Sequence, residues 1–306
     1  MGRDRKLDAV VSQTRSLKEE TSTRLKEQGQ FLNTEQGGYL ETETERERTL
    51  KVTQDELKKL LPVQNAHDIF NLTLSDFGPY NLDFSRNGKY LLLGGKKGHL
   101  AMMDWKRKTL LCEFQPKDKV RDVCFLQNQT MFAAAQSKYL HIYDNQGIEL
   151  HCMRDHNEPV KLDYLPYHYL LVSGSRLGTV RWLDVSMGQQ VGEARTKKGE
   201  MMCLRQNRMN GVIATGHTNG EVTMWTPNMG STPVVKLLAH PSAPVTSLAF
   251  SRNGNYMATT GKDSRLKIWD LRSSFKCLYD YFTPAPANTV DWSDTGLVAC
   301  GFANEV

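Results

Sequence analysis

The sequence lacks the patterns that mark membrane, secreted and disulfide-rich proteins. No apolar run approaches the roughly 18 residues that a membrane-spanning helix needs. The charged residues 1–6 lead into no apolar segment of the secretory type, so we expect an intracellular protein. The six cysteines include no C-x-x-C pair, which favours buried free thiols over disulfides or a zinc site.

Enzyme signatures are also missing. The sequence contains no H-E-x-x-H, no H-x-E with cysteine ligands and no G-x-S-x-G. The nearest approach to a phosphate-binding loop, residues 254–263, has six residues instead of four between its glycines and Asp in place of Ser or Thr. We therefore expect a protein that is not an enzyme, with no cofactor, no metal and no small-molecule substrate.

A short apolar string that ends in Trp-Asp, or in a relative of it, returns along the chain at a nearly constant interval. It is clearest in residues 266–272, Leu-Lys-Ile-Trp-Asp-Leu-Arg. The equivalent positions before Asp270, at steps of 44, 42, 40 and 40 residues, are Thr226, Asp184, Asp144 and Asp104. A unit of this length is typical of WD-repeat blades, each a four-stranded antiparallel sheet. The sequence therefore predicts an all-β, WD-repeat β-propeller.

The unit around the clearest string also predicts a buried hydrogen-bond network. In WD-repeat proteins, which this segment resembles, a His, a second-strand Ser or Thr, a turn Asp and a Trp form such a network. The matching residues are His240, Thr259, Asp263 and Trp269. A buried indole N–H without a partner would cost about 1–3 kcal/mol, which favours pairing over loose surface positions. Other units keep fragments of the set, at His156, Ser173, Thr215, Asn219 and Trp225.

The first 62 residues do not carry the repeat, so we divide the chain into an N-terminal extension, residues 1–62, and a propeller, residues 63–306. The extension should be partly helical and partly disordered: residues 1–28 predict a weakly amphipathic helix and residues 29–49 an extended or disordered segment. Thr53 and Glu56 match a capping box and predict a short helix. Such a helix is too short to stand alone. Its apolar edge must therefore dock on the propeller or on another protein, through Leu57, Leu60 and Leu61.

Positive charge gathers in predicted turns of the repeat region. The net charge of +5 is mild, and solvated loop cations would account for it. Contact with RNA phosphates or with a partner is the alternative, and such binding would depend on salt. The candidate contact residues are Lys96, Lys97, Lys106, Arg107, Lys108 and Arg121.

Several strings resemble one particular family. Residues 77–80, 85–90, 94–100, 140–152 and 216–220 are similar to the BING-four family of nucleolar WD-repeat proteins. The string at 140–152 is the most specific, because an ordinary WD repeat has no reason to read Tyr-Asp-Asn-Gln-Gly-Ile-Glu-Leu-His. The resemblance runs from about residue 38 to the end.

The resemblance implies a seven-bladed propeller that acts as a non-catalytic scaffold of the small-subunit processome, the particle that assembles on precursor ribosomal RNA. It implies a place in the nucleus and nucleolus, and a role in pre-rRNA processing and 40S subunit assembly. The expected partners are other processome proteins, with pre-rRNA or a box C/D guide RNA as candidates, and no membrane. Five full repeats and a partial sixth are encoded, so we expect a ring truncated before closure.

Two interpretations outside the nucleolus stay open. Residues 269–272 form a W-D-x-R string, which in some WD-repeat proteins marks substrate receptors of cullin ubiquitin ligases. A ligase-adaptor interaction that depends on Arg272 would identify this role. The other interpretation is a signalling scaffold that binds a peptide on the propeller face, and a location away from the nucleolus would favour it.

Overall fold

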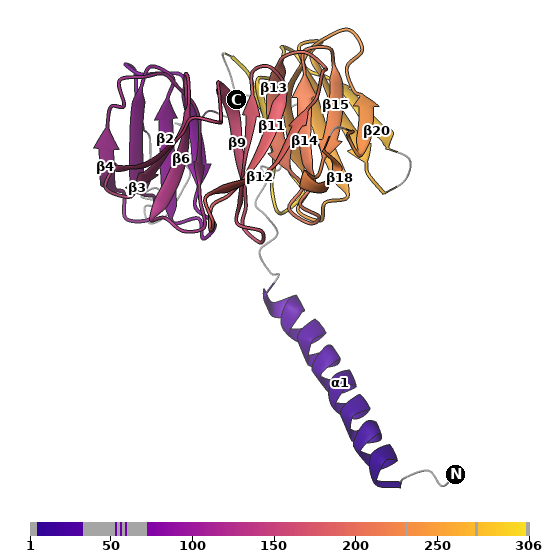
Figure 1. Ribbon diagram of the computed structural model, residues 1–306. Coiled ribbons are helices and arrows are strands. Elements are labelled where there is room, and N and C mark those ends of the chain that lie inside the picture. Colours follow the sequence, from indigo (N-terminus) through magenta and orange to yellow (C-terminus); the bar gives the residue numbers. More distant parts are fainter. Residues whose placement is uncertain are drawn as a thin grey trace. The chain divides into compact units, whose positions relative to one another are not determined.

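The computed structural model describes residues 5–32, Thr53, Glu56, Lys59, and residues 72–230, 232–272 and 275–303. The chain divides into two compact units, Met1–Leu72 and Thr73–Val306. The second unit consists of antiparallel sheets, which confirms the all-β prediction (Figure 1). No helix in the described part of the chain is long and apolar enough to cross a membrane.

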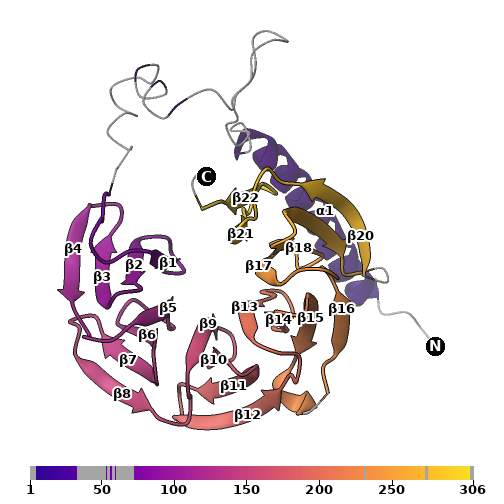
Figure 2. The same cartoon turned by 90° about the horizontal axis from the view of Figure 1, so that it is seen from above.

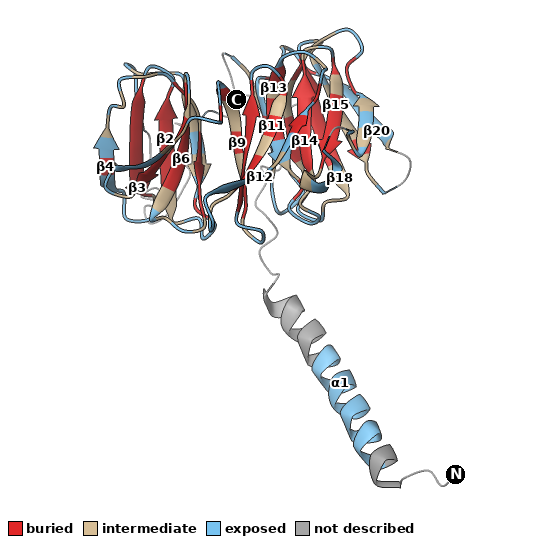
Figure 3. Cartoon of the chain, in the orientation of Figure 1, coloured by how far each residue is buried: buried red, intermediate tan, exposed pale blue. Residues whose placement is uncertain are grey.

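The first unit contains one long helix, α1 (Arg5–Leu32). Its residues 9–23 are all exposed, including Val10 and Leu17 (Figure 3). The helix includes residues 29–32, so the prediction that these four residues are extended or disordered was wrong. Each residue added to an existing helix gains one hydrogen bond, and the helix formers before Gly29 allow it to continue past that glycine. Residues 33–49 lie outside the described residues.

Thr53 and Glu56 form the reciprocal bonds of a capping box. The Thr53 backbone N–H donates to Oε2 of Glu56 at 3.0 Å, and the Glu56 N–H donates to Oγ1 of Thr53 at 3.4 Å. Glu56 and Lys59 are helical. Leu57, Leu60 and Leu61 lie outside the described residues, so the docking of their apolar edge stays a prediction.

Five four-stranded antiparallel sheets, blades one to five, follow one another along the second unit. Blade one contains β1 (Tyr80–Phe84), β2 (Tyr90–Gly95), β3 (His99–Asp104) and β4 (Thr109–Phe114). Blade two contains β5 (Val120–Phe125), β6 (Met131–Gln136), β7 (Leu140–Asp144) and β8 (Glu149–Met153). Blade three contains β9 (Pro159–Leu165), β10 (Leu170–Ser175), β11 (Thr179–Asp184) and β12 (Gln189–Arg195).

The later blades repeat this order. Blade four contains β13 (Met201–Gln206), β14 (Ile213–His217), β15 (Glu221–Trp225) and β16 (Val235–Leu238), with the short helix η2 (Pro227–Met229) before β16. Blade five contains β17 (Val245–Phe250), β18 (Tyr256–Gly261), β19 (Arg265–Asp270) and β20 (Lys276–Phe282). A partial blade of two strands, β21 (Thr289–Trp292) and β22 (Val298–Gly301), follows.

The blades are arranged as an open arc around one axis. The first strand of each blade lies innermost and the fourth lies at the rim (Figure 2), and innermost strands of successive blades contact one another. The third strands end at Asp104, Asp144, Asp184, Trp225 and Asp270. The sequence repeat predicted these ends, with Trp225 one residue before the expected Thr226. The prediction of five full blades and a partial sixth is confirmed.

The core lies between the blades. Alternate residues of a strand face opposite sides of its sheet, and blades two to five each pack against a neighbour on both sides, so their second strands are nearly continuously buried (Figure 3). Their third strands combine buried and partly buried residues, and the first residue of β19 is exposed. Tyr143 of blade two, for example, packs with Leu92 and Met102 of blade one. Trp269 of blade five packs with Met224 of blade four in the same way.

Innermost strands are also joined by a repeated hydrogen bond. Asp83 of β1 accepts from the Phe125 N–H of the next blade at 2.7 Å, and Asp122 accepts from the Leu162 N–H at 3.0 Å. Asp163 in the same way accepts from the Gln206 N–H of blade four at 2.8 Å. Burial raises the pKa of Asp83 to about 6, although its bond from the Phe125 backbone works in the opposite direction. These bonds align the inner strands of neighbouring blades.

Candidate functional site: the loop face of the propeller

One face of the arc is formed by two kinds of loop. We call it the loop face: it comprises the turn between the second and third strand of each blade and the connection from each outer strand to the next inner strand. In blade five these are residues 261–265 and, before β17, residues 238–245. The opposite face carries the other turns. Because WD-repeat blades are similar in their strands, we expect specificity to lie in such loops.

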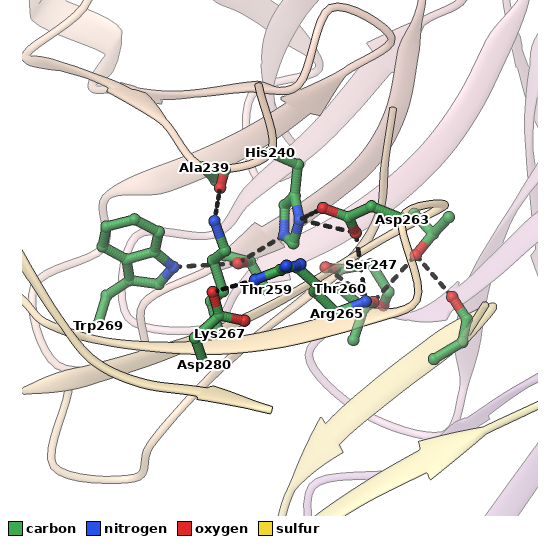
Figure 4. A network of polar contacts seen from close by, with 12 residues as sticks. Ala239, His240, Ser247, Thr259, Thr260, Asp263, Arg265, Lys267, Trp269 and Asp280 are labelled. Carbon is green, nitrogen blue, oxygen red and sulfur yellow. Dashed lines mark hydrogen bonds and ion pairs between the residues drawn. The ribbon is translucent and has the colours of Figure 1, made fainter. Parts of the chain in front are cut away.

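A buried hydrogen-bond chain fixes the loop face at blade five (Figure 4). The indole Nε1 of Trp269 donates to Oγ1 of Thr259 at 3.0 Å, and Nε2 of His240 lies 3.0 Å from the same oxygen. The other ring nitrogen of His240 lies 2.9 Å from Oδ2 of Asp263. His240 and Thr259 are completely buried. The structure therefore brings together all four residues that the sequence proposed for this network.

This hydrogen-bond chain connects two loops to the core of the sheet. His240 belongs to the connection before β17, and Asp263 belongs to the turn between β18 and β19. Gly261 leaves room for this contact, because a Cβ atom there would lie 2.7 Å from both Nδ1 of His240 and Oδ1 of Asp263. A side chain at this position would have to displace the imidazole or the carboxylate.

Blade four builds a different network around its tryptophan. Nε1 of Trp225 donates to Oγ1 of Thr223 at 2.8 Å, and Thr215 and His217 also bond this oxygen, at 2.8 and 3.0 Å. His217 pairs with the first residue of β13, as Gly261 pairs with the first residue of β17. The His217 imidazole therefore joins its network from the end of β14, whereas the His240 imidazole comes from the connection before β17. Burial lowers the pKa of His217 to about 4.

Asn219 does not join the blade-four network. Its Oδ1 instead accepts from the Glu221 N–H at 3.0 Å, within the turn between β14 and β15. The sequence grouped Asn219 with Thr215 and Trp225, and this grouping was wrong. The side-chain oxygens of Thr215 and Thr223 already bond each other and His217. The short Asn219 side chain therefore stabilises its own turn instead.

Blades two and three retain only parts of the network. In blade three, Nδ1 of His156 lies 2.5 Å from Oγ of Ser173, and burial lowers the pKa of His156 to about 4. Nε1 of Trp182 is buried without a hydrogen-bond partner among the described residues. In blade two, Gln136 donates to the Tyr143 hydroxyl at 2.5 Å, so a phenol replaces the indole.

The candidate contact residues are divided between the two faces. Lys96 and Lys97 are exposed in the turn between β2 and β3, on the loop face. This turn adjoins the connection before β5, because a Cβ atom on Gly98 would lie 2.6 Å from the Asp118 carbonyl oxygen. That connection adds two exposed cations that were not in the predicted set, Lys117 and Lys119.

The other candidates lie elsewhere. Lys106, Arg107 and Lys108 are exposed in the turn between β3 and β4, on the opposite face. Arg121 lies on the innermost strand β5, where its guanidinium is 3.5 Å from the Pro159 carbonyl oxygen. The six candidates therefore do not form one patch, because a strand of six residues separates the two turns.

A groove with a volume of about 740 Å³ lies on the loop face between blades two and three. Lys138 and Glu158 line it on one side, and Leu177, Arg195 and Lys197 on the other. Leu177 is 82% exposed at the edge of this groove. The six candidate contact residues include none from this groove, because its cations come from turns that lie far apart in the chain.

Comparisons with known proteins agree with this architecture. A family model described as Nucleolar protein 10-like, N-terminal domain, matches residues 64–303. The chain is 46% identical over 270 residues to U3 small nucleolar RNA-associated protein 7 of Saccharomyces cerevisiae, covering 88% of this chain and 48% of that protein. It is 39% identical over 311 residues to human WD repeat-containing protein 46, covering 99% of this chain and 50% of the relative.

Solved structures support the fold. The chain superposes on the crystal structure of RRP9 WD40 repeats with a TM-score of 0.65, at 19% identity, over 73% of this chain and 72% of that one. The β-propeller domain of Cps50 (Swd1) from Myceliophteria thermophila gives a TM-score of 0.64 at 18% identity, over 72% and 79% of the two chains. The chain spans about half the length of the curated relatives it matches.

Proposed function

The chain belongs to the Nucleolar protein 10-like N-terminal domain family of β-propellers, which confirms the resemblance to nucleolar WD-repeat proteins, and from this membership we propose that it acts as a non-catalytic scaffold of the small-subunit processome. In this role it supports pre-rRNA processing and 40S subunit assembly in the nucleolus. Its partners are other processome proteins, with pre-rRNA or a box C/D guide RNA as candidate contacts.

One observation carries the proposal: the similarity to a U3 small nucleolar RNA-associated protein extends over 88% of this chain. The aligned region therefore spans loops as well as strands of the repeat. Loops are the part of a WD-repeat protein in which binding specificity resides.

The loop face is the surface we assign to partner binding. It carries Lys96, Lys97, Lys117 and Lys119 around blade one and the basic groove between blades two and three. The hydrogen-bond chain through His240 and Asp263 holds the same face rigid at blade five. A rigid surface with exposed cations binds anionic partners without a large loss of conformational entropy.

The W-D-x-R string has a role within its own blade. The Arg272 guanidinium contacts the Asp270 carboxylate at 3.2 Å and the Tyr256 hydroxyl at 2.9 Å, and it lies over the Tyr256 ring. These contacts join the turn after β19 to the start of β18. They explain the string without a ubiquitin-ligase partner.

Affinity purification of the tagged protein from nuclear extract, after crosslinking, tests the proposal. Mass spectrometry and RNA sequencing of the product should identify processome proteins and precursor ribosomal RNA, with protein crosslinks concentrated on the loop face. Recovery of a ubiquitin-ligase adaptor or a cytoplasmic signalling complex in their place would reject the scaffold role.

A further inference from the structure

Strands β7 and β8 place three metal-binding side chains on one face of blade two. His141 and Cys152 are direct cross-strand partners, and Glu149 pairs with Tyr143, two residues along β7 from His141. Residues two apart on a strand point to the same side of the sheet. The three side chains belong to residues 140–152, the string that the WD repeat itself does not explain.

The donor atoms of these residues are close together. One ligand atom from each of His141, Glu149 and Cys152 lies within 4.8 Å of the other two. Sγ of Cys152 is 3.9 Å from Nε2 of His141, and Oε2 of Glu149 is 3.5 Å from Nδ1 of the same ring. Among the described residues, this is the one group of three or more such donors that could hold a metal ion.

The hairpin that carries the group is packed against blade one at two points. The His141 ring stacks on Tyr143, with ring centroids 6.1 Å apart, and Tyr143 is buried against blade one. A Cβ atom on Gly147, in the turn of the hairpin, would lie 2.7 Å from the Phe114 ring of blade one. The donors therefore stand on a rigid support, as a preformed metal site requires.

We propose that His141, Glu149 and Cys152 form a zinc site. A thiolate, an imidazole and a carboxylate are all ligands of Zn²⁺, and the soft thiolate disfavours Mg²⁺ and Ca²⁺. Zinc–ligand bonds of about 2.0–2.3 Å place tetrahedral neighbours about 3.5 Å apart, so Sγ of Cys152 and Nε2 of His141 need to approach by only a few tenths of an ångström. The exposed Glu149 carboxylate now faces Nδ1 and has to swing across to an ion bound at Nε2. On binding, the Cys152 thiol loses its proton to solvent.

Three protein ligands leave the fourth zinc position open. Water fills this position in the isolated protein. Glu149 is 50% exposed, whereas the His141 side chain is 15% exposed, so the site opens to solvent on the carboxylate side. The sequence predicted no metal site because its cysteines lack zinc-type spacing. Here the ligands are brought together by strand register, which spacing rules do not detect.

Protection of cysteines from alkylation tests the proposal within one molecule. Metal-free protein is treated with iodoacetamide, with and without equimolar Zn²⁺, and the modified cysteines are quantified by mass spectrometry. We expect Zn²⁺ to slow alkylation of Cys152 at least about tenfold, because a zinc-bound thiolate is withdrawn from reaction. Cys277 on β20 is the internal control, because it is exposed and lies outside the group. Its rate should not change.

Cobalt titration gives an independent measure. Co²⁺ bound to a thiolate produces a charge-transfer absorption, and we expect one equivalent to bind and to be displaced by Zn²⁺. C152S should abolish the absorption, and H141Q should weaken binding at least about tenfold, because even the loss of an outer-sphere partner costs that much. C277S should leave binding unchanged, and a thermal melt without metal identifies any variant that has simply unfolded.

Three results would overturn the proposal. One is equal alkylation of Cys152 with and without Zn²⁺ in the unmutated protein, which does not depend on any variant. Another is a cobalt absorption that survives C152S in folded protein. A third is a Cys152 thiol that reacts much faster than Cys277 at a rate that zinc does not change, which would assign the group to thiol activation by His141.

Discussion

Trp269 and Thr259 are joined by a hydrogen bond of 3.0 Å from the indole Nε1 to the threonine Oγ1. Blade four satisfies Trp225 in a similar way, through Thr223 at 2.8 Å. The two acceptors lie on different strands, since Thr259 belongs to the second strand of its blade and Thr223 to the third. Blades four and five thus pair the equivalent indole with acceptors on different strands, so the position of the acceptor is not fixed by the fold.

Replacing Trp269 should cost more than its volume alone explains. Trp269→Ala should lower the free energy of unfolding by about 3–5 kcal/mol, because it creates a cavity and removes the bond to Thr259. Trp269→Phe should cost about 1–3 kcal/mol more than Trp182→Phe. Trp182 is a matched control, since its buried Nε1 has no hydrogen-bond partner among the described residues. Chemical denaturation measures both differences, and equal costs for the two Phe variants would refute the network.

Thr223→Val tests the alternative network of blade four. Valine has nearly the shape of threonine but removes the oxygen that Trp225, Thr215 and His217 share. The unfolding free energy should fall by at least about 2 kcal/mol, because several buried polar groups lose a partner together. Thr109→Val on the exposed start of β4 should change stability by less than about 0.5 kcal/mol. Similar effects at both positions would contradict our assignment.

Stability should fall as the pH is lowered from 7 to 5. The pKa of His156 and that of His217 are each lowered to about 4 by burial, so both imidazoles are neutral in the folded protein. Unfolded histidine, with a pKa of about 6.5, binds more protons in this range, so acid favours unfolding by about 2 kcal/mol per histidine at pH 5.

Asp83 acts in the opposite direction over part of the same range. Its pKa is raised to about 6, so the folded protein binds the extra proton, and stability from this group is lost as the pH rises through 6. Burial also raises the pKa of Asp163, although Arg205 and two backbone hydrogen bonds oppose the rise, so these two carboxyl groups offset only part of the effect of the two imidazoles. Urea unfolding at pH 5, 6 and 7 should therefore show that the free energy of unfolding falls on acidification, and the fall should be smaller in His217→Gln. A net gain in stability at pH 5 would be inconsistent with the buried neutral histidines.

Basic residues on the two faces should contribute unequally to RNA binding. Replacing Lys96, Lys97, Lys117 and Lys119 by Ala should weaken single-stranded RNA binding and reduce the slope of log K against log salt by up to about 3. The matched control replaces Lys106, Arg107 and Lys108 on the opposite face, and its slope should stay within about 1 of the unmutated protein. Fluorescence anisotropy over a salt series measures both. A larger effect of the control set would move the binding surface to the opposite face.

The repeat predicted the blades well because spacing is a property of the sequence. The alignment of Asp184 with Asp270 also gave the register of blade three: Leu183 pairs with the second residue of β10, as Trp269 pairs with the second residue of β18. Trp182 lies one residue earlier than the position of Trp269. A shift of one residue turns a side chain to the other face of the sheet, so Trp182 packs towards blade four instead.

Side-chain neighbours set by blade packing or by strand register were the part that the sequence did not predict. The blade-five network was foreseen because all four of its residues match a known pattern at fixed spacing. The groove beside Leu177 and the group formed by His141, Glu149 and Cys152 depend on which turns and strand positions become neighbours in space. Such neighbours follow from blade packing and strand register, for which the sequence carries no local signal.

Sedimentation of the tagged full-length protein tests the scaffold role most directly. Nuclear extract is separated on a sucrose gradient, and the protein is located in the fractions and, in parallel, by microscopy in cells. We predict that it co-sediments with large pre-ribosomal particles, shifts to light fractions after ribonuclease treatment, and concentrates in nucleoli. Sedimentation as a free monomer in untreated extract, together with diffuse cytoplasmic signal, would contradict a role in the processome.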